Sequence, residues 1–200
     1  MRIPTLAVTL ALLMSLAACR RQQIVNGPQG AGCTPPVAVT LDTKLIPQET
    51  DQWCWAASGQ MIMSFLNHDV RQCLQANNEF GRSDCCLAPP PAECIQGGWP
   101  EFAKYDFTDD RTSDSYLTWD QLREQIACRK TPVAFSWHWI DGGGHMKVIY
   151  GYAVENGVNS LWVNDPWEPH IGAKQIITYE EYIAGSTHTH WDDFYNIAHK

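Results

Sequence analysis

Hydrophobic positions divide the chain into a helical first part and a strand-rich second part. Residues 53–66 carry apolar side chains on several faces of a helix, which is the pattern of a buried central helix. Thr50 or Asp51 is the predicted N-cap of this helix, so that Cys54 lies in its first turn. Residues 70–107 are rich in cysteine, proline, glycine and asparagine, and we expect irregular chain with short helical turns there.

The second part predicts strands joined by short turns. Capping boxes at Thr118 and Thr178 predict the beginnings of two short helices. We expect strands at residues 133–139, 146–154, 160–164 and 174–178. Because helices come first and antiparallel strands follow, the predicted fold class is α+β.

The first residues predict export. A basic start followed by an apolar run over residues 6–18 is typical of a secretory signal, and the run is shorter than the ~20 residues that span a bilayer. The sequence Leu-Ala-Ala before Cys19 resembles a bacterial lipobox, so we expect a signal peptide at residues 1–18 and a lipid anchor on Cys19. Ordinary signal cleavage nearby is the alternative. We expect the protein in a bacterial envelope membrane, facing the periplasm or the cell surface, or secreted.

Composition adds a domain division and excludes one class of function. Residues 19–40 contain Gly-Pro and Pro-Pro and are interpreted as a tether, with Cys33 able to pin it to a domain at residues 41–200. Hydrophobic residues make up 44% of the 200 residues, enough for a substantial core. With 14 Lys and Arg against 22 Asp and Glu, the net charge is -8, which argues against a general nucleic-acid binder.

Cys54 is the first candidate for chemistry. A cysteine in the first turn of a helix faces free backbone N–H groups and the positive end of the helix dipole, and both favour the nucleophilic thiolate. The alternatives are a core residue or a disulfide partner. Thiol catalysis also requires an imidazole, and His145 is the best placed, because it follows three glycines and begins an apolar strand. His138 lies between two tryptophans and is better explained by packing.

Asp165 is the candidate for orienting the imidazole, and the turn before it decides whether it can reach His145. A three-residue loop at residues 155–157 would set Asp165 opposite Lys147, on the same face as His145. A two-residue Asn-Gly turn would place the two side chains on opposite faces. A catalytic role for Asp165 therefore predicts the three-residue, glycine-bulge hairpin.

Three segments carry these candidates: Q-E-T-D-Q-W-C-W-A-A-S at 48–58, G-H-M-K-V-I-Y-G-Y at 144–152 and V-N-D-P-W at 163–167. Together they resemble the papain-like cysteine peptidases, in particular the small bacterial branch that includes secreted effector proteases. The resemblance implies a papain-like fold in which the helix that carries the cysteine packs against a C-terminal antiparallel sheet. It also implies hydrolysis of peptide bonds in a protein or peptide substrate.

The resemblance gives each candidate a role. Cys54 would be the nucleophile, His145 the general base and acid, and Asp165 the orienting residue. Gln48, six residues before the cysteine, would donate to the oxyanion hole, and Trp167 would shield Asp165. The family usually has Asn at the third position, so Asp adds a charge. An acyl transferase or isopeptidase would use the same residues, and a non-catalytic, disulfide-stapled lipoprotein that binds a peptide or a host partner is the alternative from another class.

With Cys19 lipid-modified and Cys54 free, an even number of cysteines remains. We expect three disulfides among Cys33, Cys73, Cys85, Cys86, Cys94 and Cys128. Six cysteines allow 15 connectivities, and the adjacent pair is not expected to bond to itself. Zinc at these cysteines lacks a nearby histidine, and His188 with His190 is a weak ligand set. We therefore expect no metal or other cofactor, and a monomer.

Overall fold

The computed structural model describes residues 32–200, in which an antiparallel sheet of seven strands is flanked by short helices. The strands run in the order β2-β7-β3-β4-β5-β6, and β1 pairs with the second half of β4. The strands are β1 Ala38–Thr40, β2 Phe107–Arg111, β3 Val133–Trp139, β4 Gly144–Glu155, β5 Val158–Asp165, β6 Ala173–Thr178 and β7 His188–His199. The α-helices are α1 Cys54–Phe65, α2 Gln72–Glu79, α3 Trp119–Arg123 and α4 Tyr179–Ile183.

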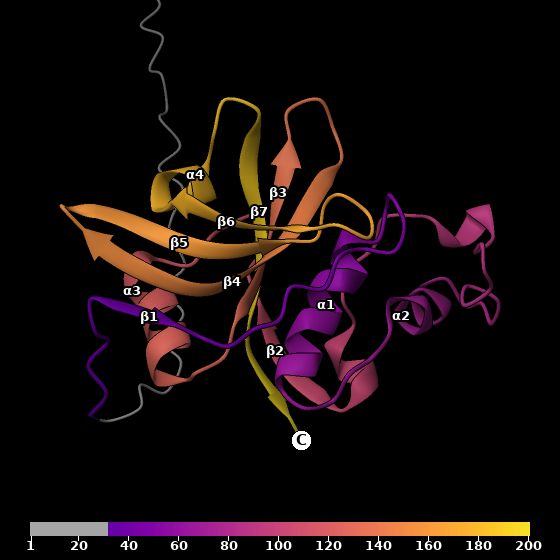
Figure 1. Ribbon diagram of the computed structural model, residues 1–200, viewed down its shortest axis with the longest axis horizontal. Coiled ribbons are helices and arrows are strands. Elements are labelled where there is room, and N and C mark those ends of the chain that lie inside the picture. The colour runs from indigo at the N-terminus through magenta and orange to yellow at the C-terminus, as the bar shows by residue number, and fades with distance from the viewer. Residues whose placement is uncertain (1–31) are drawn as a thin grey trace, which may run out of the picture.

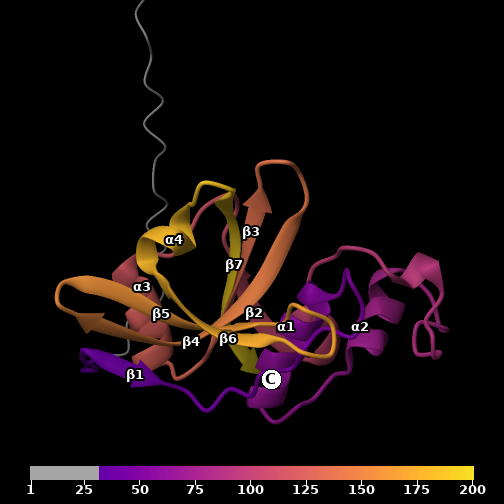
Figure 2. The same cartoon turned by 45° about the horizontal axis from the view of Figure 1, so that its top comes forward.

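The helices cover the two faces of the sheet separately. In Figures 1 and 2, α1 and α2 lie on one side of the sheet, and α3 and α4 lie on the other. Each side has its own apolar core: α1 packs with Met146, Val148 and Phe194, whereas α3 packs with Phe135 and Ile149. Neighbouring residues along a strand alternate between these cores, as the period of two requires. The predicted α+β class is confirmed.

Helix α1 is the predicted buried helix, but its predicted N-caps are wrong. All residues from Trp55 to Met63 are buried. Trp53, not Thr50 or Asp51, occupies the cap position, and it makes no side-chain cap hydrogen bond. Its buried indole instead donates to the Cys94 carbonyl at 2.7 Å. A tertiary contact therefore holds the beginning of this helix where sequence suggested a local cap.

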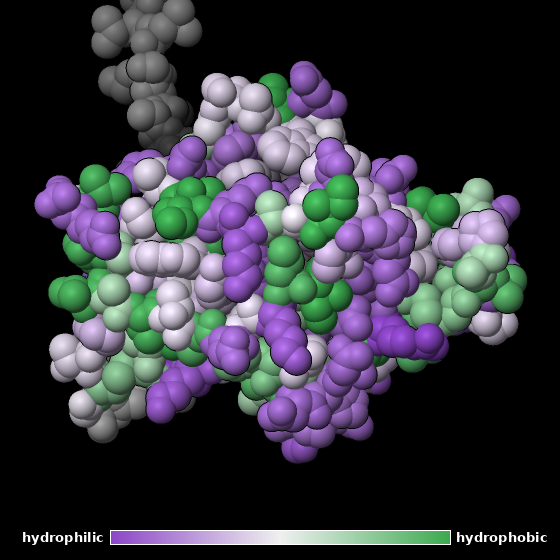
Figure 3. Space-filling view, viewed as in Figure 1, coloured by the Kyte–Doolittle hydropathy of each residue, from purple (hydrophilic) through white to green (hydrophobic). Residues whose placement is uncertain are grey.

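The segment after α1 contains α2 and two 3₁₀ turns, Ala92–Cys94 and Phe102–Tyr105, within otherwise irregular chain. The six expected cysteines are all paired, as Cys33–Cys128, Cys73–Cys86 and Cys85–Cys94. Two of these bonds lie in this segment and tie its loop to α2 and to the first 3₁₀ turn. The surface over the loop is largely apolar on the face shown in Figure 3, with Leu87 61% exposed.

Residues 33–40, assigned to the tether from sequence, are attached to the domain. Cys33 is bonded to Cys128 at the end of the π-helical turn Glu124–Cys128, which continues α3. The short strand β1 pairs with β4, where a side chain at Gly151 would lie 2.8 Å from the backbone of Val39. The signal peptide at 1–18 and the anchor at Cys19 fall outside the described residues. Across 32–200, no helix combines the length and apolar character that a membrane span needs.

The hairpin between β4 and β5 corrects the predicted turn but keeps its consequence. Glu155 pairs directly with Val158, so the turn has two residues, and both Asn156 and Gly157 have positive φ, as a type I′ turn requires. The predicted three-residue loop is therefore wrong. Between Gly151 and Ile149 the register shifts by one residue, so a β-bulge at position 150 restores the face that the turn would have reversed. Asp165 thus still lies beside Lys147 and His145.

Besides the short β1, two strands, β2 and β7, have no counterpart among the predicted elements. β2 is polar apart from Phe107 and pairs along one side with β7. β7 contains the polar residues Asp192 and Asp193, both buried. Each is satisfied by partners distant in sequence: Arg111 pairs with Asp192, and the Tyr182 hydroxyl donates to Asp193 at 2.7 Å. Because these polar residues face inward, the sequence alternation that marks a strand is hidden.

Candidate active site

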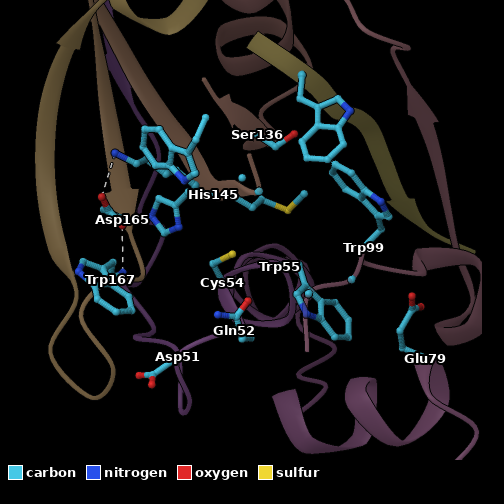
Figure 4. A pocket seen from close by; sticks show the side chains of 18 residues that line it. Asp51, Gln52, Cys54, Trp55, Glu79, Trp99, Ser136, His145, Asp165 and Trp167 are labelled. Atoms are coloured by element: carbon cyan, nitrogen blue, oxygen red, sulfur yellow. Dashed lines mark hydrogen bonds and ion pairs between the residues drawn. The ribbon is translucent and has the colours of Figure 1, made fainter. Parts of the chain in front are cut away.

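A cleft of about 680 Å³ opens where the beginning of α1 meets the sheet. Its walls carry Cys54, Trp55, His145, Asp165, Trp167 and Trp191 (Figure 4). The helical part and the sheet part of the fold therefore each supply one wall. The structure brings the three candidates Cys54, His145 and Asp165 into one cavity.

Cys54 is the first residue of α1 and the free cysteine of the described chain. It is partly buried, and Figure 4 shows its thiol and the His145 ring on facing walls of the cleft. The first backbone N–H groups of a helix have no partner within the helix, so they point toward whatever lies at its beginning. A thiolate at Cys54 is stabilised by these groups.

His145 and Asp165 form a close pair across β4 and β5. The Nε2 atom of His145 lies 2.6 Å from Oδ1 of Asp165, and both side chains are nearly buried. Burial works against the charged imidazolium. The hydrogen bonds and charges of Asp165 and Cys54 outweigh burial and raise the pKa of His145 to about 9. At neutral pH the imidazole is therefore protonated beside the thiol.

Both oxygens of the Asp165 carboxylate are fully engaged. Oδ1 also accepts the Trp167 backbone N–H at 2.9 Å, while Oδ2 lies 2.9 Å from the Lys147 ammonium and accepts from Gln175 at 3.1 Å. Burial opposes the charged carboxylate, but His145 and Lys147 outweigh it and lower the pKa of Asp165 to about 2. Lys147 and Gln175 were not singled out from sequence, although the position of Lys147, two residues after the histidine on the same strand face, was a usable signal.

Gln48 is fully buried and is not among the residues that line the cleft. Its Nε2 donates to the Thr50 carbonyl at 2.7 Å, and its Oε1 has no hydrogen-bond partner among the described residues. Gln52, which sequence reasoning passed over, is exposed and lines the cleft beside Cys54 (Figure 4). An amide nitrogen carries two N–H groups, so one on Gln48 remains beyond its bond to Thr50.

Tryptophans frame the His145–Asp165 pair. Trp167 lies beside Asp165 in Figure 4 and is 47% exposed, and its side chain lines the cleft. The Trp139 ring stacks nearly parallel to the His145 ring, 6.4 Å between centroids. His138, expected to pack between its neighbouring tryptophans, is instead exposed, with its ring 4.7 Å from that of Trp191.

Among residues 32–200, the other histidines and cysteines are not part of the cleft lining. His188 contacts the Glu181 carbonyl at 2.8 Å, and His190 contacts the Tyr182 carbonyl and the Asp193 carboxylate. In the part of the chain that the structure describes, one compact group of metal-type ligands occurs, formed by Asp84, Cys85 and Cys94. The two sulfurs of that group are bonded to each other. Cys85 and Cys94 therefore offer no thiolate to a metal ion.

Comparison with solved structures shows the fold. A structure from work on the mite allergens Blo t 1 and Der p 1 is similar with a TM-score of 0.56 and 11% identity, over 88% of this chain and 74% of that chain. Procathepsin L 3 from Tenebrio molitor larval midgut has a TM-score of 0.46 and 15% identity, over 82% of this chain and 71% of that chain. Xylellain, a cysteine protease from Xylella fastidiosa, has a TM-score of 0.48 and 13% identity, over 81% of this chain and 86% of that chain. A search of curated proteins finds no match.

A helix that begins at a free cysteine and packs on an antiparallel sheet bearing a histidine defines the class of papain-like cysteine peptidases. The chain belongs to the family described as papain-like cysteine protease AvrRpt2, whose model matches residues 37–184. The resemblance inferred from the three sequence segments is thereby confirmed, and the protein is a cysteine peptidase that acts on protein or peptide substrates.

Proposed function

We propose that the protein hydrolyses peptide bonds through Cys54, His145 and Asp165. The observation that carries this proposal is the 2.6 Å contact of His145 with Asp165 in the same cleft as the free thiol. The Cys54 thiolate attacks the peptide carbonyl carbon, and the carbon–nitrogen bond breaks as the His145 imidazolium protonates the departing amine. The neutral imidazole then takes a proton from water, whose oxygen attacks the thioester and releases the carboxylic acid and the thiolate.

Asp165 orients the imidazole throughout this cycle. Its pKa of about 2 keeps the carboxylate charged in the working pH range, and its hydrogen bond to Nε2 leaves Nδ1 for the exchange with sulfur and substrate. The charge of the carboxylate stabilises the His145 imidazolium until it donates its proton to the departing amine. This arrangement supports the role that the family resemblance gives to Asp165.

The oxyanion is proposed to form between the Cys54 backbone N–H and the Gln48 side chain. The spacing of six residues and the buried, restrained position of Gln48 support this role. Its second amide N–H would have to reach the cleft, because the first donates to Thr50. Gln52 is the competing donor, since its side chain lines the cleft beside the nucleophile.

We further propose that the chain is exported, acylated at Cys19 and monomeric. The lipobox-like residues before Cys19 support acylation. Three disulfides support maturation in an oxidising compartment, since such bonds are rare in reducing ones. Cys19→Ser would be expected to move the protein from the membrane fraction to the soluble fraction of a bacterial host. Retention of that variant in the membrane fraction would contradict the anchor.

The catalytic proposal is tested with a thiol-reactive peptide probe and a peptide library. The wild type should be labelled and should cleave the library, whereas Cys54→Ala should do neither. His145→Ala keeps the thiol and should lose cleavage, with labelling slowed by orders of magnitude. Equal labelling of wild type and Cys54→Ala would remove Cys54 from the mechanism. Cleavage by a folded His145→Ala at the wild-type rate would remove His145.

A further inference from the structure

A buried lysine stands directly behind the proposed catalytic pair. Lys147 lies two residues after His145 on β4, so the two side chains share one face of the strand. It is 4% exposed, and its ammonium lies 4.1 Å from the centre of the Trp137 ring. The same face also carries the apolar Ile149 and, on β7, His190 and Asp193, which pair with each other at 3.2 Å. A charged group in such a place needs partners, because water does not solvate it.

The ammonium finds its partners in the proposed site. It lies 2.9 Å from Oδ2 of Asp165 and donates to Oε1 of Gln175 at 3.1 Å. Gln175 in turn donates to the same carboxylate oxygen. The carboxylate is therefore divided: Oδ1 faces His145, and Oδ2 faces Lys147. One carboxylate therefore pairs with two cationic groups, the imidazolium of His145 and the ammonium of Lys147.

Stability alone gives no reason for this arrangement. An apolar side chain of similar length would fill the space beside Trp137 without the desolvation cost of an ion pair. The other charged groups on the cleft walls are Asp51 before α1 and Glu79 at the end of α2, and both are acidic. Lys147 is thus the cation that faces the pair from β4, while β3 contributes Trp137 and β6 contributes Gln175.

We propose that Lys147 is a positioning residue of the peptidase: by sharing the Asp165 carboxylate, it fixes that group and weakens its hold on the imidazole proton. The proposal rests on the catalytic roles of His145 and Asp165. An unshared carboxylate at 2.6 Å would retain the proton more strongly, and that proton has to reach the leaving amine. Lys147 itself touches no reacting atom.

The sign of the effect follows from the charges. A nearby positive charge disfavours protonation of an imidazole, so the removal of the ammonium should raise the pKa of His145. In Lys147→Met the alkaline limb of the kcat/KM profile should move to higher pH by about one unit. The loss of activity should fall on kcat rather than KM, because the Lys147 ammonium is buried against Asp165 and Gln175 and leaves little surface for a substrate to contact.

Two measurements test this inference together. The pH dependence of kcat/KM is compared among wild type, Lys147→Met, Lys147→Arg and the control Lys174→Met, which removes an exposed lysine from β6. In parallel, nitrogen-15 NMR follows the titration of His145 in Cys54→Ala and in Cys54→Ala/Lys147→Met, with the signal assigned through His145→Gln. The NMR titration needs no catalysis, so it still decides about Lys147 if the peptidase proposal fails.

The expected result is an upward shift of His145 titration and of the alkaline limb in Lys147→Met, with Lys147→Arg and Lys174→Met close to wild type. An unchanged His145 titration in folded Lys147→Met would overturn the proposal and leave Lys147 a packing residue. A downward shift would also overturn it, since it would mean that Lys147 strengthens the hold of Asp165 on the imidazole. Circular dichroism establishes that the variants compared are folded.

Discussion

The helical part and the sheet part of the molecule are each stabilised internally by a different kind of bond, and the cleft lies where the two parts meet. From α1 to the 3₁₀ turn at Phe102–Tyr105, the chain is short-helical or irregular, and two disulfides close its loops. The sheet is held by continuous ladders, and it carries His145 and Asp165 on adjacent strands. The base and its partner are thus fixed by register, whereas the position of Cys54 depends on how α1 packs and on the loop that supports it.

The largest expected effect comes from the sheet side. Asp165→Asn should lower kcat/KM by about 10²- to 10⁴-fold, because His145 loses its charged partner. It should also lower the free energy of unfolding by about 3–5 kcal/mol, because the Lys147 ammonium is left buried without a counter-charge. Steady-state kinetics and urea unfolding measure the two losses. The double variant Asp165→Asn/Lys147→Met should regain stability but not activity; recovery of both would show that the loss of activity was a folding defect.

On the helical side, the oxyanion donor should matter next. Gln48→Ala should lower kcat by about 10²- to 10³-fold with little change in KM, as expected when a donor to the transition state is lost. Gln52→Ala is the matched variant at the cleft surface. A large loss of kcat in Gln52→Ala together with normal turnover in Gln48→Ala would transfer the role to Gln52.

A disulfide comparison separates the two parts directly. Cys85→Ser/Cys94→Ser and Cys33→Ser/Cys128→Ser should each lose about 2–4 kcal/mol of unfolding free energy in urea titrations. Only the first pair should also lower kcat in the folded protein, because the Cys94 carbonyl accepts from Trp53, the residue before the nucleophile. Equal turnover in both double variants would mean that the helical part keeps Cys54 in position without the Cys85–Cys94 disulfide.

The smallest effect is the dependence on pH. Since the pKa of His145 is raised to about 9, the imidazolium and its pairing with Asp165 persist through neutral pH. The stabilisation that this pairing gives is complete below the unfolded-state value near 6.5 and is lost as the pH rises through about 9. We expect the alkaline limb of kcat/KM near pH 9. An alkaline limb near pH 6.5 would show that the His145–Asp165 pair does not raise the pKa of the imidazole in solution.

Local signals predicted most of the fold and three residues, Cys54, His145 and Asp165, that the structure brings into one cleft. The capping boxes at Thr118 and Thr178 and strand β3 are as expected. What sequence could not supply depended on distant partners: the disulfide connectivity, the inward-facing polar strand β7 and the contacts of Lys147. The hairpin shows the limit well. Asn156-Gly157 forms the two-residue turn that its residues favour, and the bulge that rescues the register lies at a position with no sequence signal of its own.

The Cys33–Cys128 bond has a consequence for how the enzyme would present itself. It ties the beginning of the described chain to the end of the α3 segment, which packs on the face of the sheet opposite to α1 (Figure 1). A tether formed by the residues before Cys33 would therefore join the domain beside α3, and not beside the cleft wall that begins at Cys54.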